Sequence, residues 1–122
     1  MNHHLPPPSE ELSRRLLGTV PYRDRLPAGR LFPPVGIIPG HVRSLGELHL
    51  LLTPDVRSLP GLSLTALADW VQRIIGDLEL AHGLRNATEN SGSYVENCLT
   101  VYELVGLRLQ QAREATGQEV LS

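Results

Sequence analysis

The chain of 122 residues contains no lysine, and all 11 of its basic residues are arginine. This absence excludes a lysine Schiff base, a catalytic lysine and a phosphate-binding loop of the Gly-Lys-Ser/Thr type, because each of them needs a lysine amine. Function classes that depend on lysine are therefore excluded at the outset.

Cysteine and aromatic residues are also scarce. Cys98 is the single cysteine, so the chain cannot form an internal disulfide or a cysteine-based zinc cluster. With one Trp, three Tyr and one Phe, a core must consist mainly of Leu, Val, Ile and Ala. No run approaches the ~20 apolar residues that span a bilayer, and residues 1–8 lack the pattern of a signal peptide. We therefore expect a cytoplasmic protein with no membrane partner.

Two segments carry an apolar residue at every third or fourth position, which is the period of an α-helix. The first covers about 64–85, and the second covers about 94–116 and follows a capping box formed by Ser93 and Glu96. Residues 86–92, between them, are rich in turn-forming residues. The sequence therefore predicts an all-α fold whose core is an antiparallel two-helix hairpin.

The chain before this hairpin is predicted to pack on it. Short helices are expected over 9–18, 45–52 and 53–56. Residues 19–40 contain five prolines and three glycines, which interrupt any run long enough for a helix. Their apolar residues favour an extended segment that lies across the hairpin, and the alternative is an extended strand that a partner protein binds. The predicted single domain, 1–122, comprises a short helix with a Pro/Gly-rich arm, further short helices, the hairpin and a tail, over 1–43, 44–60, 61–117 and 118–122.

Facing positions of the two hairpin helices pair about a turn centred near Glu89. In this pairing Gly76 lies opposite Tyr102, where the missing side chain leaves room for the phenol ring. Asp77 lies near Glu103, but paired carboxylates of this kind are common on solvated helix faces, and no histidine joins them as in di-iron bundles. We therefore expect a packing role for Gly76 and no chemistry at the carboxylates.

The apolar face of the second hairpin helix is wider than one partner helix can cover. The remainder must pack against the N-terminal segment or against a second copy, in a four-helix arrangement about a two-fold axis. We therefore favour a non-catalytic protein-binding or oligomerisation module, with a homodimer preferred. The candidate interface residues are Trp70, Leu99, Val101, Leu104, Leu107, Phe32, Ile37 and Ile38.

Charge is unevenly divided along the chain. Residues 1–43 carry six arginines against three acids, a net charge of +3, and residues 44–122 carry five arginines against ten acids, a net charge of −5. The basic part can pack over the acidic hairpin or bind an acidic partner. The alternative function is therefore a regulatory module that binds nucleic acid or another polyanion, although the absence of lysine and the small number of aromatic residues argue against nucleic acid. The candidate contacts are Arg14, Arg15, Arg23, Arg25 and Arg30.

No residue pattern specifies a catalytic, cofactor or metal site. Helix pairing brings His82 near Cys98, but a buried thiol in an apolar stripe is usually inert. His41 and His49 flank Glu47 without the spacing of a zinc-binding motif. We therefore predict no catalytic residue, no cofactor and no metal ligand, leave small-molecule binding open, and rank an enzyme below both binding functions.

Overall fold

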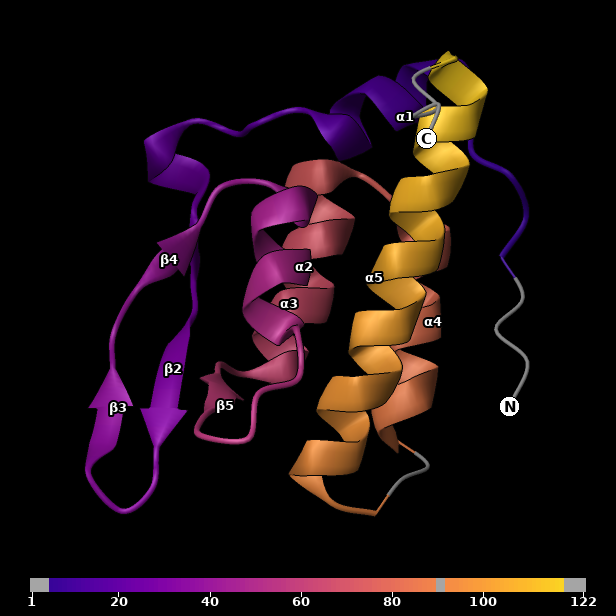
Figure 1. Cartoon of the computed structure of the whole chain (residues 1–122). Coiled ribbons are helices and arrows are strands. Elements are labelled where there is room, and N and C mark those ends of the chain that lie inside the picture. The colour runs from indigo at the N-terminus through magenta and orange to yellow at the C-terminus, as the bar shows by residue number, and fades with distance from the viewer. Residues whose placement is uncertain (1–4, 90–91, 118–122) are drawn as a thin grey trace.

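The computed structural model describes residues 5–89 and 92–117 and shows a mixed fold, so the prediction of an all-α fold is wrong (Figure 1). Helices account for 59% of the described residues and strands for 13%. The predicted tail, 118–122, lies outside the described residues. The helical elements are α1 (Glu10–Leu17), the 3₁₀ turn η1 (Tyr22–Asp24), α2 (Leu45–Leu52), α3 (Leu64–Trp70), the π-helical segment η2 (Val71–Ile75), α4 (Leu78–Glu89) and α5 (Tyr94–Thr116). The strands are β1 (Leu26–Pro27), β2 (Gly29–Phe32), β3 (Gly36–Ile38), β4 (His41–Val42) and β5 (Leu59–Gly61).

The helices form two layers, with α2 and α5 in front of α3 and α4, while α1 crosses one end and the strands lie beside α2 (Figure 1). Helix α5 packs against α1, α2 and α4. Leu16 of α1, Leu48 of α2 and Val105 of α5 have no exposed surface. Burying an aliphatic side chain contributes roughly 1.5–3 kcal/mol, so each of these three residues stabilises the packing of α1, α2 and α5. Much of the broad apolar face of α5 is thus covered within the chain.

Four helices begin directly after a capping serine, and Ser63 caps α3 by accepting from the Ala66 N–H at 3.1 Å. The hydroxyls of Ser9, Ser44 and Ser93 each accept a hydrogen bond from the backbone N–H three residues further on. Ser93 also forms the predicted capping box with Glu96. The predictions of α1, α2 and α5 are therefore confirmed.

The first helix of the predicted hairpin is not continuous. It breaks at Gly76, which has a left-handed φ of 87° that glycine adopts without steric cost. The Asp77 carboxylate then caps α4 by accepting from the Leu80 N–H at 3.0 Å. The prediction of one helix over 64–85 is therefore wrong. The apolar period did not reveal the break, because α3 and α4 face the same core and the period continues across Gly76.

The prediction that Gly76 lies opposite Tyr102 is also wrong. A Cβ on Gly76 would come within 3.0 Å of the Arg15 guanidinium, so α1 covers this glycine, whereas Tyr102 stacks on His49. Helix α4 also extends to Glu89, so the connection to α5 is shorter than the predicted turn over 86–92.

The Pro/Gly-rich arm forms strands that the sequence did not predict. Strand β1 pairs with β4, and a three-stranded sheet has the order β3-β2-β5, with all pairs antiparallel. Proline and glycine exclude helix here, but they permit strands of two to four residues between them. The expected helical turn over 53–56 is absent, and Pro60-Gly61 belongs to β5.

Candidate functional site

An apolar groove of about 270 Å³ opens between the β2–β3 hairpin and the start of α3. Ten residues line it, drawn from segments 27–29, 37–40 and 61–66. None of them carries a charge, and Ser63 supplies the one polar side chain. The groove therefore suits an apolar group, because a charged one would lose its water without gaining a partner.

Strand β3 borders this groove and presents apolar side chains to solvent. Val35 is 89% exposed, Ile37 58% and Ile38 59%. No residue from Phe32 to Gly40 carries a charge. Within the described residues β3 pairs on one side only, with β2, so its other backbone edge is free. We call Val35, β3 and the adjoining groove the β3 surface.

The opposite edge of the same sheet is shielded. The Tyr94 hydroxyl, at the start of α5, donates to the Pro60 carbonyl of β5 and accepts from the Leu62 N–H at 3.3 Å. Burial raises the pKa of Tyr94 to about 12, so the hydroxyl remains a donor at neutral pH. Pro60 itself has no N–H to offer. The sheet therefore has one protected edge and one open edge.

The structure separates the predicted interface residues into three groups. Trp70, Val101 and Leu104 are buried, and the Trp70 indole N–H donates to the Asp24 carbonyl at 2.6 Å. Leu107 is half-buried and Leu99 is 43% exposed, both on α5. The residues of the arm, Phe32, Ile37 and Ile38, lie on the β2–β3 hairpin, where Phe32 is half-buried. Among the predicted interface residues, Ile37 and Ile38 of the arm are therefore the exposed ones that lie beside the apolar groove.

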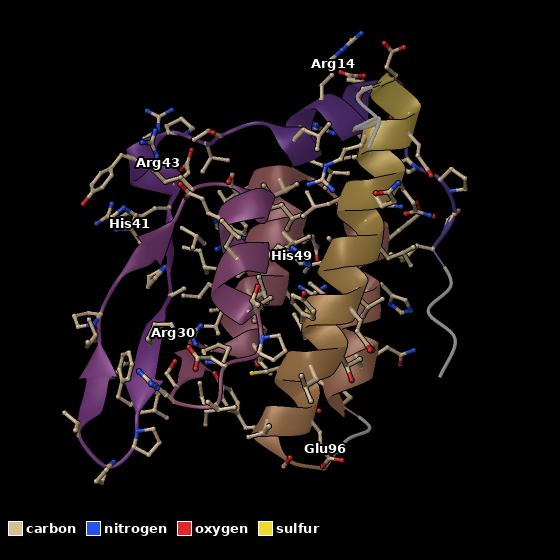
Figure 2. All side chains as sticks on the ribbon, viewed as in Figure 1. Arg14, Arg30, His41, Arg43, His49 and Glu96 are labelled. Carbon is tan, nitrogen blue, oxygen red and sulfur yellow. The ribbon has the colours of Figure 1, made fainter. Side chains whose placement is uncertain are left out.

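The predicted basic residues do not gather in one patch. Arg14 lies on α1, at the opposite end of the molecule's upper edge from His41 and Arg43 (Figure 2). It forms an ion pair with Glu10 one helical turn away. Arg30 turns inward, where it donates to the Ser58 hydroxyl and to the Leu51 carbonyl. Arg30 thus holds the strands to the loop before β5 and is not a free cation.

The remaining arginines lie beside η1 and α1. Arg25 lies over the ring of Tyr22, with its guanidinium carbon 4.0 Å from the ring centroid, and His41 meets the same ring edge-on at 5.2 Å. Arg23 is 3.9 Å from the Asp24 carboxylate, and Arg15 covers Gly76. Among the predicted contacts, Arg23 and Arg25 therefore form one small basic corner around an exposed tyrosine.

A buried ion pair is the largest feature that the sequence reasoning missed. Arg108 of α5 and Asp77 are both fully buried, and the guanidinium donates two hydrogen bonds to the carboxylate, at 2.7 and 3.0 Å. Arg108 also donates to the Pro6 carbonyl and to Gln111. The position of Arg108 in the sequence could have indicated its burial, because it continues the helical spacing of the buried residues Val101, Val105 and Ala112. All described buried polar side-chain atoms have hydrogen-bond partners, those of Arg108 and Asp77 included.

A second open groove, of about 370 Å³, follows α4 beside residues 5 and 6. Its lining includes Glu79, His82 and Asn86 of α4. His82 is exposed, whereas Cys98 is buried. Burial raises the pKa of the Cys98 thiol, which makes it a poor nucleophile. Within residues 5–89 and 92–117 no cluster of His, Cys, Asp or Glu has the geometry of a metal site.

His49 of α2 lies between α2 and α5 (Figure 2). Its ring stacks on Tyr102, with centroids 4.6 Å apart and planes 2° from parallel. A Cβ on Gly106 would come within 2.8 Å of His49 Nε2, so the ring also lies against the backbone of α5. Burial, and then the charge of Arg113, lower the pKa of His49. The neutral ring is therefore the form that fits the fold.

Stability is accordingly expected to fall as the pH drops below about 6.5, the ordinary pKa of histidine. From that pH downward the unfolded chain binds a proton that the folded chain binds only at its lowered pKa, which favours unfolding. Urea unfolding between about pH 5 and 7.5 measures the free energy of unfolding. This free energy should decrease less toward acid pH in His49→Gln than in the wild type. The exposed His82→Gln variant should keep the wild-type loss, and an unchanged loss in His49→Gln would refute this role.

Comparison with protein-family models, with curated proteins and with solved structures finds no significant match to this chain. Across the described residues no helix combines the length and apolar character needed to cross a membrane. Functional inference therefore depends on the site itself.

Proposed function

We propose that the protein is a non-catalytic protein-binding module that holds an extended, uncharged segment of its partner along the β3 surface. The observation that carries this proposal is the open edge of β3, with Ile37 and Ile38 more than half exposed beside an uncharged groove. A free strand edge offers unpaired N–H and C=O groups to another chain, and an adjacent pocket selects its alternate side chains.

The arrangement of the β3 surface supports a strand as the bound form. Ile37 and Pro39 both line the groove, so a strand added beside β3 would direct its own alternate side chains toward the same groove. The groove lining consists mainly of Pro, Gly, Ala, Leu and Ile, which cannot neutralise a charge. An extended segment with aliphatic residues at alternate positions therefore fits best.

We also propose a cytoplasmic location for this module. The single cysteine, Cys98, is a buried free thiol packed in the core, as is usual for proteins of reducing compartments.

The proposal is tested with labelled heptapeptides and fluorescence polarisation. An acetylated, amidated peptide of alternating threonine and valine is expected to bind the protein, whereas the same peptide with glutamate for valine is not. Ala66, exposed on α3, lines the groove, so Ala66→Glu should weaken binding of the valine peptide at least tenfold, ~1.4 kcal/mol.

Ala115→Glu is the matched control, because it makes the same change at an exposed position near the end of α5. It should leave the affinity for the valine peptide unchanged. Absence of binding, or an equal loss in both variants, would refute the β3 surface as the binding site.

A polyanion-binding module is the alternative proposal, and the corner around Tyr22 is the observation that favours it. Tyr22 is 55% exposed and flanked by Arg25 and His41, which provides a ring for stacking next to positive charge. Binding of a labelled oligothymidine that weakens steeply with added salt and is lost in Arg25→Gln would support it. Negligible binding at low salt would refute it.

A further inference from the structure

We infer that the β3 surface binds a second copy of this chain, with the two β3 strands pairing antiparallel across a two-fold axis. This inference rests on the proposed function and names the partner. Its starting point is that the surface requires an extended, uncharged segment with apolar residues at alternate positions. Val35, Ile37 and Pro39 meet that requirement on the chain's own exposed strand.

The apolar side chains from Val35 to Pro39 are complementary to themselves in this pairing, although Pro39 contributes no N–H to the backbone hydrogen bonds. Centred on Ile37, the register places the two Ile37 residues opposite each other, Gly36 opposite Ile38 and Val35 opposite Pro39. Directly opposite residues share a face of the sheet, and Ile37 and Pro39 already line the groove. Val35 of the second copy therefore extends toward the groove of the first, and Gly36 leaves room for Ile38.

The charges near β3 do not oppose the pairing. The β2 residue that pairs with Ile38 is Arg30, and its guanidinium is engaged with Ser58 and lies 3.8 Å from the Asp55 carboxylate. The stretch from Phe32 to Gly40 has no charge of its own. The two copies therefore meet through neutral strands, without burying an unpaired charge.

The geometry also explains why assembly stops at two copies. Pairing would create one continuous sheet with the strand order β5-β2-β3-β3-β2-β5. Both of its outer edges are then β5, which is shielded by Pro60 and by the Tyr94 hydroxyl. A two-fold contact between identical edges closes on itself, whereas an open edge at both ends would continue into a fibre.

The first test is sedimentation equilibrium of the full chain from about 1 μM to 1 mM. The wild type is expected to rise from the mass of one chain toward that of two. Ile38→Glu, which places a charge on the exposed edge strand, should weaken dimerisation at least tenfold. Leu78→Glu, a matched change at an exposed leucine of α4, should behave as the wild type. Circular dichroism verifies that each variant is folded.

The second test examines the register and does not depend on Ile38. In a Cys98→Ala background, Ile37→Cys should form a disulfide-linked dimer on mild oxidation, because opposite residues of paired strands have Cα atoms about 4.5–5.5 Å apart. Leu78→Cys in the same background is the control and should remain monomeric.

The outcomes separate this inference from the proposed function. A chain that stays monomeric at every concentration, with Ile37→Cys linking no faster than Leu78→Cys, would overturn the dimer. So would a dimer that Ile38→Glu leaves intact, because its interface would lie elsewhere. If such a chain still binds the threonine–valine peptide, the proposed function stands without the dimer. If it binds neither, both fail.

Discussion

Replacing Arg108 with methionine is expected to lower the free energy of unfolding by about 3–5 kcal/mol. The change leaves the Asp77 carboxylate fully buried without the guanidinium that now donates two hydrogen bonds to it. It also removes the donor to the Pro6 carbonyl and so releases the segment before α1. Urea unfolding of the variant and the wild type measures the loss.

Two comparisons assign that loss to the buried pair. Arg73→Met, at an exposed position of η2, should change stability by less than about 0.5 kcal/mol. Adding Asp77→Asn to Arg108→Met should recover part of the loss, because asparagine removes the buried charge and can still cap α4. A loss below about 1 kcal/mol in the single variant would show that the pair does not stabilise the fold.

Gly29→Ala is expected to destabilise the protein by about 3 kcal/mol or more. A Cβ on Gly29 would lie 2.1 Å from the Ile38 carbonyl oxygen, so β3 could not remain where it pairs with β2. Because this change displaces the strand that forms the proposed binding edge, the variant should also fail to bind the threonine–valine peptide. Thermal unfolding and fluorescence polarisation measure the two effects.

Gly46→Ala is the matched control for this change. Gly46 lies inside α2, and its Cβ would approach only the Ser44 hydroxyl, at 3.9 Å, among non-neighbouring atoms within 4 Å. Alanine should therefore stabilise the helix by up to about 1 kcal/mol and leave peptide binding intact. Equal stability of Gly29→Ala and the wild type would mean that β2 and β3 are not packed as closely as described.

The helices with explicit start signals could be predicted from sequence, and the strands could not. Serine caps determine where α1, α2 and α5 begin, because the hydroxyl satisfies a local N–H that the helix leaves free. Strands β1 to β5 have two to four residues each, too few for an alternating pattern to appear. Gly76 shows a second limit: its left-handed backbone interrupts a helix whose apolar period continues beyond it.

The candidate site was predictable in part. The exposed arm residues Ile37 and Ile38 followed from an apolar stretch that contains no charge, and the sequence left open whether that stretch packs within the chain or binds a partner. The burial of Arg108 could not be predicted from its residue type, since arginine in a helix is normally solvated. Its burial depends on Asp77, which lies 31 positions away and becomes available only because α4 begins there.

Backbone amide chemical shifts measured during titration with the threonine–valine peptide test the central claim most directly. The account predicts that the largest changes occur at Val35, in β3 and along the groove-lining segments 27–29 and 61–66. Changes concentrated instead around Leu99 of α5, or at the arginine corner near Tyr22, would contradict it and move the binding surface to another face of the protein.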